Sequence, residues 1–520
     1  MGAKSVTLLT RPVKWLPFDD GNASVPANIR SRQVAAMNIT SFEFALFFAV
    51  VLPLNWLLRP RAGLYRLFLL LTSYVFYASF NAKFLLILLV FSFLTWFFAV
   101  VFAETSDARF RRFCLILYCG FALGMLIFFK YYEMLYISVD WLYRVFDAQS
   151  PVPLLDVIMP IGISFFTFQG MAYAIDVYRD AAKVERSLVE VFCYIAFFPT
   201  ILSGPILRAG NFLPQLKKEH VIGTDFTRAF YLLTRGLIKK IIISSYLSEH
   251  IVRSTFGAPE GFTSAAVLVG ILSYTAQIYC DFSGYSDLAQ GVALLMGFDI
   301  PDNFNAPYVS LSLRDFWRRW HITFSLWLRD YLYISLGGNR KGRPRKYVNL
   351  VTTMALGGLW HGAAYNFLIW GFIHGLGLIW AHLVNEFRSA RAAVRTAAGL
   401  PPAKLGFWGM GWIVLSWAAT FAYVNVAWVF FGAEDAGKAM DILRRVAAWD
   451  GTGEGFRPTC LVLVGLVLAV QLLRLGGRDV FRSVFDRLPA PVAGMALGLA
   501  GALILKLGPD GVLPFIYFQF

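Results

Sequence analysis

Long apolar runs follow one another through most of this chain, separated by short polar segments. In order they are 42–58, 64–80, 84–103, 113–129, 154–177, 188–205, 229–247, 262–298, 347–384, 407–431, 460–473 and 491–507. A helix of about 20 residues crosses the hydrocarbon core of a bilayer, and two of the runs are long enough for two passes or a bent helix. The pattern therefore predicts an all-α polytopic membrane protein with roughly 11 to 13 transmembrane or re-entrant helices.

Composition supports the same class. The chain has 520 residues, of which 58% are hydrophobic and only 15% charged, and its mean hydropathy is +0.59. Soluble domains are nearer half apolar and a quarter charged. The net charge of +15 could indicate a nucleic-acid partner, but the basic residues lie in short loops between apolar runs. We interpret this charge as orienting the helices in the lipid bilayer, and expect no nucleic-acid partner.

The five cysteines show no spacing typical of metal ligands, and most of them lie in apolar stretches. They are Cys114, Cys119, Cys193, Cys280 and Cys460. Small buried hydrophobic side chains explain them better than disulfides or zinc ligands do. The sequence therefore predicts neither a disulfide framework nor a metal site.

Residues 1–36 differ from the rest of the chain. They are rich in proline and polar residues and contain no apolar run long enough for the core of a signal peptide. We interpret them as a disordered extension, with Met37 as an alternative start, or as an amphipathic tail on the membrane. Residues 37–520 are expected to form one membrane domain whose core motifs lie between 279 and 380.

Loop charge predicts which side of the membrane each loop faces. Arg388, Arg391 and Arg395 follow the run 347–384, which places that loop in the cytoplasm because basic residues are enriched on that side. The loop 432–459 mixes acidic with basic residues and is expected outside.

Cysteine probes placed near Arg343 and Arg391 should therefore react with a membrane-impermeant reagent only from the cytoplasmic side. A probe near Asp450 should react only from outside, because it follows one further pass of the chain. Labelling of the Asp450 probe from the cytoplasm would mean that the number of passes after Val384 is wrong.

The segment 314–321, Arg-Asp-Phe-Trp-Arg-Arg-Trp-His, concentrates charged and aromatic side chains. On a helix, Asp315 could pair with Arg318 or Arg319, three and four residues away. The segment is either an aromatic belt with snorkelling arginines or a binding surface for an anionic donor such as a coenzyme A phosphate. The candidate residues for donor binding or support of the core are Asp315, Arg318, Arg319, Trp320, Trp360, Asn339, Arg340 and Lys341.

His361 lies between glycines in a stretch without charged residues from Lys346 to Glu386. A neutral imidazole at membrane depth can accept a proton from a hydroxyl group, although a lone membrane histidine is often a helix–helix hydrogen bond. The glycines would let a backbone or a substrate approach closely. His374 and His382 share the region without a distinctive setting, and we interpret them as structural.

Several motifs in a fixed order resemble the membrane-bound O-acyltransferase family, and within it the bacterial alginate O-acetylation branch. They are Asp281–Asp287, Asn303–Tyr308, Arg314–His321, Gly337–Gly342 and Leu359–Gly362, together with Phe198–Ile206 and Trp428–Phe431. The resemblance extends from about Met37 to the C-terminus. It implies a ring of tilted helices around a funnel-like centre, with a tunnel through it.

The resemblance also implies roles for two histidines. His361 would be the catalytic residue and His321 the second histidine of the core. Whether His361 acts as a general base or carries the acyl group transiently stays open. His321 lies next to Arg318 and Arg319 in the sequence, and their charges would disfavour a protonated imidazole. We expect His321 to orient the donor or to support the basic surface.

Donor, partners and location follow from the same resemblance. The acetyl group would come from a cytoplasmic donor, acetyl-CoA, with no permanently bound cofactor. It would reach an alginate-like or cellulose-like exopolysaccharide through periplasmic acetyltransferase partner proteins, across a bacterial inner membrane. One alternative is D-alanyl transfer to teichoic acid. A membrane transporter with a histidine proton relay is an alternative of another class, although the chain lacks the internal repeat typical of many transporters.

Overall fold

The computed structural model describes residues 37–146, 148, 151–153, 155, 157–218, 225–397, 407–473 and 480–507. Regular structure in these residues is helical, apart from a single bridge between Phe262 and Glu454. The expectation of an all-α protein is confirmed. The interpretation of residues 1–36 as an extension concerns a segment outside the described residues.

The helices differ greatly in length. The first part of the chain forms α2 (Phe42–Leu58), α3 (Ala62–Ala78), α4 (Ala82–Glu104), α5 (Ala108–Val145), α6 (Ile163–Tyr178), α7 (Leu188–Ala196), α8 (Phe198–Ile201) and α9 (Ala209–Lys217). The middle forms α10 (Phe226–Leu237), α11 (Ser245–Leu247), α12 (Arg253–Gly257), α13 (Ser264–Leu295), α14 (Leu313–Arg319) and α15 (Ile322–Trp327). The last part forms α16 (Gly342–His361), α17 (Tyr365–Ala397), α18 (Phe407–Gly432), α19 (Ala436–Ala448), α20 (Pro458–Leu472), α21 (Val480–Phe485) and α22 (Ala490–Leu507).

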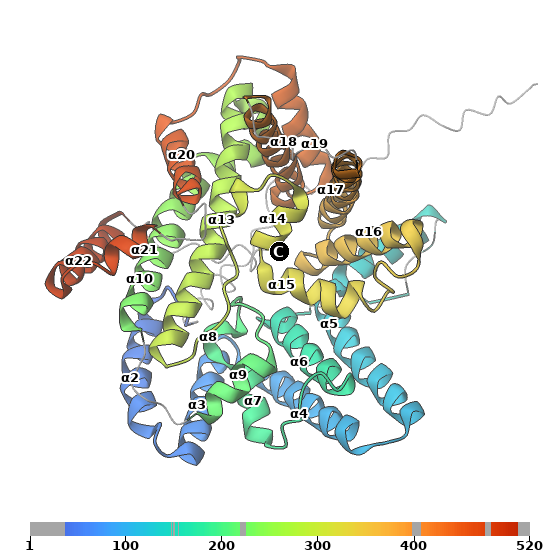
Figure 1. Ribbon diagram of the computed structural model, residues 1–520, viewed down its shortest axis with the longest axis vertical. Helices are drawn as coiled ribbons and strands as arrows, with labels where there is room; N and C mark the ends of the chain where they lie inside the picture. The colour runs from blue at the N-terminus through green and yellow to red at the C-terminus, as the bar shows by residue number, and fades with distance from the viewer. Residues whose placement is uncertain are drawn as a thin grey trace, which may run out of the picture.

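Figure 1 shows these helices arranged around a centre in which the short helices α14 and α15 lie. Helices α2 to α6 form one side, α16 to α18 a second and α10 with α20 a third. Turns of π-helix at 238–244, 248–252 and 328–333, and of 3₁₀-helix at 259–261 and 307–309, lie between the helices of the middle of the chain. The short helices α14 and α15 thus lie at the centre of the ring, beside the long helix α13.

Among the described residues, five helices are long and apolar enough to cross a membrane. They are α4, α5, α13, residues 365–394 of α17 and residues 409–432 of α18. Four shorter apolar segments are α2, α3, α20 and residues 492–502 of α22. The most apolar part of α13 is 78% buried inside the protein, against 22–39% in the other four. The protein is therefore a multi-pass membrane protein with α13 as its most enclosed long helix, while the total of about 11 to 13 segments stays a prediction.

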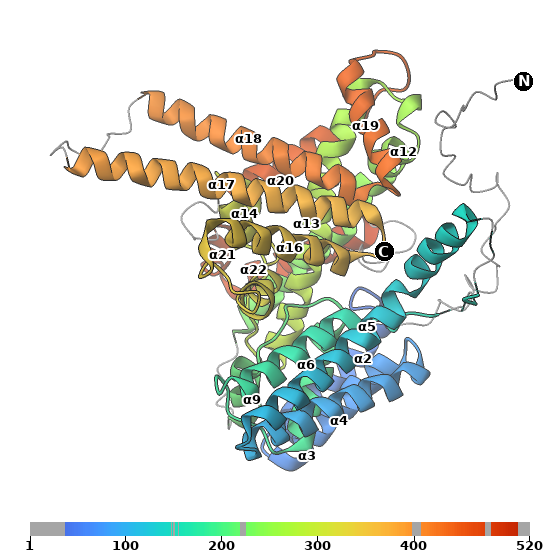
Figure 2. The same cartoon turned by 90° about the vertical axis from the view of Figure 1, so that its right-hand side faces the viewer.

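The two ends of the long helices differ in character. Figure 2 shows the joined ends of α17 and α18 projecting on one side of the molecule, while α19 lies on the opposite side. The basic start of α16 is on the same side as the end of α17, because Lys346 Nζ lies 3.0 Å from a carboxylate oxygen of Glu386. This arrangement agrees with a basic side and an opposite side that carries the loop around Asp450.

Helices α16 and α17 approach each other closely at glycines. A Cβ atom on Gly358 would lie 2.2 Å from the carbonyl oxygen of Phe367, and one on Gly371 would lie 2.4 Å from that of Met354. Small residues allow such close backbone contact between membrane helices. Of the two possibilities expected for the glycines near His361, close approach of a backbone is the one found here.

Replacing Gly358 by valine should therefore lower the midpoint of thermal unfolding in detergent, because α17 must move to accept the side chain. Overpacking of this kind costs about 1–3 kcal/mol or more. Gly411 of α18 is the matched control, since no atom lies within 4 Å of a Cβ built there. Equal unfolding midpoints for Gly358→Val and Gly411→Val would contradict the close contact.

A second close contact joins α10 to α13 at the Asp281–Asp287 motif. A Cβ on Gly236 would lie 2.8 Å from the carbonyl oxygen of Gly284. Beside this contact, Lys240 forms a buried ion pair with Asp281. Breaking a buried ion pair leaves a charge without compensation, at a cost of several kcal/mol. The Asp281–Asp287 motif therefore connects α13 to α10 and the turn that follows it.

Candidate active site

His361 ends α16 in a box of aromatic rings. Its side chain is only 3% exposed. The ring centroid lies 4.9 Å from that of Trp360 and 5.5 Å from that of Phe324. Trp370 of α17 and Phe431 of α18 complete the box, each at 5.1 Å. Rings from four helices, α15 to α18, therefore enclose this imidazole.

His321 enters the same aromatic cluster from the turn between α14 and α15. Its ring is fully buried and lies 4.6 Å from Phe282 and 4.9 Å from Phe324. Trp360 follows at 6.0 Å. Because Phe324 and Trp360 contact both imidazoles, the structure brings His321 and His361 together at the centre of the ring of helices.

Two features of His321 are typical of a functional residue. Its backbone has φ +41°, a left-handed conformation that few residues other than glycine adopt. In addition, neither ring nitrogen has a hydrogen-bond partner among the described residues. A buried polar atom without a partner costs roughly 1–3 kcal/mol. The arrangement is therefore better suited to binding a polar substrate group than to stabilising the fold.

The Asn303–Tyr308 motif holds the turn that carries His321. Ile322 donates its backbone N–H to the carbonyl of Asn303 at 2.9 Å, and Asn305 donates to the carbonyl of Arg319 at 2.9 Å. The hydroxyl of Thr323 also donates to the Asn303 side chain at 2.8 Å. These bonds lie on both sides of His321 and fix its strained backbone.

Helix α5 supplies two side chains that cap the end of α16. Lys130 Nζ donates to the carbonyl oxygens of Trp360 and His361, the second at 3.0 Å. The hydroxyl of the neighbouring Tyr131 donates to the carbonyl of Leu359 at 2.6 Å. The last carbonyls of a helix lack partners within it and carry partial negative charge, so a cation stabilises them. Both side chains therefore hold the turn that carries His361.

Comparison with known proteins identifies the family to which this site belongs. Residues 72–424 match the membrane-bound O-acyltransferase family. The chain belongs to this family. Its resemblance to the family, drawn above from motifs alone, is confirmed, and the chain is an O-acyltransferase.

Three relatives show how far the similarity extends. The chain is 36% identical over 507 residues to a probable alginate O-acetylase of Pseudomonas putida, covering 91% of this chain and 98% of that protein. It is 30% identical over 417 residues to a peptidoglycan O-acetyltransferase of Helicobacter pylori, covering 74% of each. A teichoic acid D-alanyltransferase of Bacillus subtilis is 29% identical over 256 residues, covering 46% of this chain and 63% of that protein.

Four of the predicted site residues of this O-acyltransferase gather at its centre. Besides the two histidines, Trp360 lies between them, and Trp320 packs behind them against Phe304 at 5.0 Å and Trp428 at 4.8 Å. The Trp428–Phe431 motif reaches the site as well, because Phe431 contacts His361.

The charged residues of α14 lie away from the imidazoles. Asp315 pairs with Arg319 at 3.0 Å, as the spacing allowed, and Arg318 is exposed. The expectation that both arginine charges act on His321 is therefore wrong, because that ring contacts aromatic side chains instead. Arg318 is close to His321 in the sequence but faces outwards, because neighbouring residues on a helix face different directions.

The basic loop lies at the far end of α16. Asn339, Arg340 and Lys341 are exposed, and Asn349 holds the loop by donating to the carbonyl of Gly338 at 2.9 Å. α16 has 20 residues, so at about 1.5 Å per residue its ends are roughly 30 Å apart. These three residues therefore lie outside the histidine site. If they bind the donor, they hold a part of it that is remote from the two histidines.

His374 has a partner of its own. Its ring is fully buried, and Trp317 donates its indole N–H to His374 Nδ1 at 3.2 Å. Its ring centroid lies 4.7 Å from Trp370, which also contacts His361. The hydrogen bond fits the structural role expected for His374.

Lys130 is the residue near the site that motif reasoning missed. The apolar run expected to form this helix ends at Phe129, whereas α5 continues to Val145. The signal in the sequence was a single lysine directly after an apolar run, because a charged side chain at membrane depth is costly and therefore indicates a functional site.

Within the part of the chain that the structure describes, no group of three or more His, Cys, Asp or Glu could hold a metal ion.

His321→Ala should lower the rate of acyl transfer by about 10- to 100-fold without abolishing it, because a hydrogen bond to a substrate group is worth about 1.5–3 kcal/mol. The measurement is acyl transfer at matched membrane abundance, with His250→Ala as control, because His250 lies on the π-helical turn 248–252 and stacks on Tyr246. An unchanged rate would contradict contact between His321 and the substrate.

Proposed function

We propose that this O-acyltransferase takes an acetyl group from acetyl-CoA on the cytoplasmic side of a bacterial inner membrane, and passes it on for O-acetylation of an exopolysaccharide. The observation that carries the proposal is the pair His361 and His321, buried together at the centre of the ring. The alginate O-acetylase relatives, similar over nearly their full length, support acetyl as the group transferred.

The reaction needs little more than a positioned base. The donor is a thioester and is already activated, so the oxygen of an acceptor hydroxyl attacks its carbonyl carbon. His361 takes the proton of that hydroxyl. The carbon–sulfur bond then breaks, and the leaving thiolate receives the proton from the imidazolium of His361. His321, with both ring nitrogens at the site, donates a hydrogen bond to the carbonyl oxygen as negative charge develops on it.

The acceptor side involves other proteins in this proposal. The enzyme hands the acetyl group to periplasmic acetyltransferase partner proteins, which esterify an alginate-like or cellulose-like polymer. A membrane protein whose site is enclosed by aromatic rings has little room for a polysaccharide chain, which supports a relay through a smaller acceptor group.

D-alanyl transfer to teichoic acid is the second candidate, favoured by the similarity to the Bacillus subtilis D-alanyltransferase. That similarity spans 46% of this chain, against 91% for the alginate O-acetylase relative. The extent of the match therefore favours acetyl transfer. Membership of an O-acyltransferase family disfavours the transporter alternative.

The test uses the full chain in lipid nanodiscs with acetyl-CoA labelled in the acetyl group. Release of free CoA and appearance of the label on a partner protein or polymer are expected, and neither with His361→Ala. A D-alanyl-charged carrier protein serves as the competing donor. Transfer of D-alanine without transfer of acetyl would replace the proposal by the second candidate.

A further inference from the structure

Three arginines meet two aspartates near the end of α6, in what we call the arginine cluster. Arg208 binds one carboxylate oxygen of Asp330 at 2.7 Å and lies 3.8 Å from Asp176. Arg329 binds the other oxygen of Asp330, also at 2.7 Å. Arg179 donates instead to the backbone carbonyl of Asp330 at 2.9 Å, and it pairs with no carboxylate among the described residues. The arginine cluster therefore carries three positive charges against two negative ones.

The residue next to Arg179 in the sequence does not cancel this difference. Asp180 pairs with Arg111 at 3.3 Å, so that pair is neutral. The other group to which Arg179 donates is the uncharged hydroxyl of Ser335, at 3.0 Å. The side chains of Arg179 and Arg329 are exposed. Because the planar guanidinium group of arginine fits phosphate oxygens in pairs, both side chains suit a phosphate-bearing solute.

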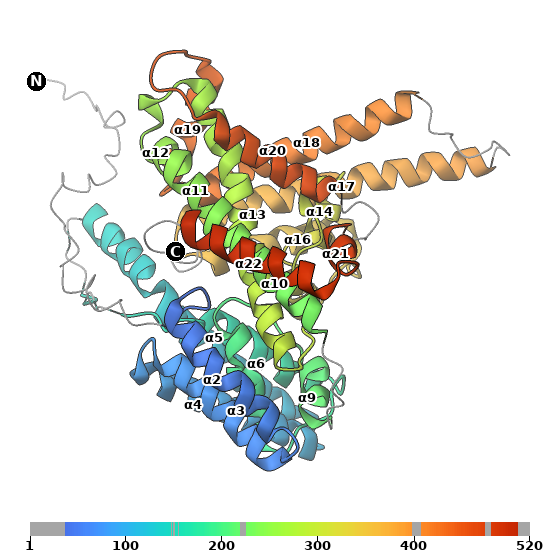
Figure 3. The same cartoon turned by 90° about the vertical axis from the view of Figure 1, so that its left-hand side faces the viewer.

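The arginine cluster lies on the basic side of the protein. Arg179 reaches Ser335, in the turns that lead to the basic start of α16. Figures 2 and 3 both show α9, which directly follows Arg208, on the side where the joined ends of α17 and α18 project. Loop charge predicts that this side faces the cytoplasm. A CoA thioester approaching from the cytoplasm would therefore meet these arginines.

A column of aromatic rings connects the arginine cluster to the histidine site. Tyr331 belongs to the cluster through a hydrogen bond to Asp176 and lies 5.4 Å from Trp327, measured between ring centroids. Trp327 stacks on Phe168 at 3.8 Å, and Phe168 lies 5.4 Å from Trp360, the neighbour of His361. The pantetheine arm of CoA, about as long as four to five extended residues or roughly 15 Å, spans a distance of this order.

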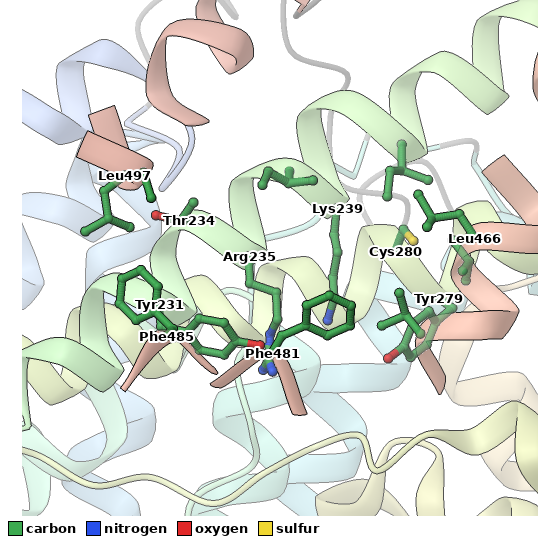
Figure 4. A pocket seen from close by; sticks show the side chains of 15 residues that line it. Tyr231, Thr234, Arg235, Lys239, Tyr279, Cys280, Leu466, Phe481, Phe485 and Leu497 are labelled. Atoms are coloured by element: carbon green, nitrogen blue, oxygen red, sulfur yellow. The ribbon is translucent and has the colours of Figure 1, made fainter. Parts of the chain in front are cut away.

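A second pair of cations suits phosphates less well. Arg235 and Lys239 reach a pocket of about 420 Å³, where Figure 4 shows them among mostly apolar side chains. Both bind the carboxylate of Asp287, at 2.6 and 2.8 Å. A phosphate group there would compete with this carboxylate in surroundings that offer few other polar groups. The arginine cluster is therefore the better candidate for binding a donor with several phosphates.

We propose that Arg179 and Arg329 bind phosphate groups of the acyl donor, while its pantetheine arm passes along the column of rings to His361. The inference rests on the proposed function, in which acetyl-CoA is the donor. Since the histidines are buried, the rings of the column must part to admit the arm. The π-helical turn 328–333 carries Tyr331 in this column, and such turns are frequent at functional sites. The two arginines thus select a donor that carries a nucleotide.

The experiment compares acetyl-CoA with acetyl-pantetheine, which keeps the thioester and the arm but has no phosphate. The full chain is assayed in phosphatidylcholine nanodiscs, and release of the free thiol gives the rate for both donors. Arg179→Met should raise the KM for acetyl-CoA about tenfold with little change in kcat, because a hydrogen bond to a charged group is lost. The KM for acetyl-pantetheine should not change. Arg329→Met should give the same difference between the donors.

Arg186→Met is the matched control, because this exposed arginine pairs with Glu104 outside the arginine cluster. It should change neither KM. Arg179→Lys keeps the charge without the planar group and should recover part of the affinity for acetyl-CoA.

An equal rise in the KM for both donors in Arg179→Met would overturn the proposal, because a general disturbance of the fold affects both donors alike. An unchanged KM for acetyl-CoA would overturn it as well. So would an effect of Arg179→Met that appears only in nanodiscs with phosphatidylglycerol, because the arginines would then bind a lipid phosphate. A wild-type protein that transfers acetyl from neither donor would refute the proposed function, and this inference with it.

Discussion

His361→Ala should abolish detectable acetyl transfer while the protein reaches the membrane at its normal level. General-base assistance is typically worth about 10²–10⁴ in rate, and alanine leaves no group that could accept the proton. The fold should tolerate the change better than the activity does, because His361 lies at the end of α16, where Lys130 and Tyr131 hold the backbone through its carbonyl oxygens.

The control for this variant is His382→Ala. His382 lies on α17 outside the aromatic box and is only partly buried, so its loss should leave transfer nearly unchanged. The measurement is the rate of acetyl transfer at equal membrane abundance, together with a search for an acetylated enzyme after rapid quenching. Near-normal transfer by His361→Ala would refute its role, and an acetyl group trapped on His361 would make it a carrier instead of a base.

Lys130→Met should lower the maximal rate by about 10- to 100-fold with little change in the KM for the donor. The variant removes two charge-assisted hydrogen bonds to the end of α16, each worth about 1.5–3 kcal/mol, and the turn that carries His361 is then free to move. Because 1.4 kcal/mol corresponds to a factor of ten in rate, a small misalignment of His361 is sufficient to lower the rate by this amount. Lys130 thus acts as a positioning residue.

Two adjacent tyrosines offer a matched control. Tyr131→Phe removes the bond to Leu359 and should give a smaller loss of the same kind. Tyr132→Phe removes a bond to Pro153, away from α16, and should have no such effect. Lys130→Arg, which keeps the charge, should restore part of the rate. A fall in thermal stability alone, with the maximal rate per folded molecule unchanged, would show that Lys130 only stabilises the fold.

The class of the protein and the identity of its central residues could be predicted from the sequence. Apolar runs of membrane length depend on local composition, so they predicted α4 and α18. His361 became a candidate because ionisable side chains in apolar surroundings are costly and therefore rare. These two arguments need only nearby residues, whereas the role of His321 was implied by the resemblance of its motif to the membrane-bound O-acyltransferase family.

What the sequence could not determine is which distant residues meet. Asn339, Arg340 and Lys341 precede His361 closely in the chain, yet a straight helix places them roughly 30 Å from it. Arg318 adjoins the turn of His321 and faces outwards, because successive side chains on a helix point in different directions.

Lys130 is the opposite case, a residue far from the motifs in the sequence that contacts the site in the structure. It is remote from every motif, and only the packing of α5 against the end of α16 gives it a role. The sequence by itself thus determined the membrane class and made His361 a candidate, since both depend on local polarity, and its motifs added His321 through the family resemblance. The tertiary structure alone decided that Phe324 and Trp360 unite the histidines, that Lys130 supports His361 and that the basic loop lies apart, since helix packing sets these distances.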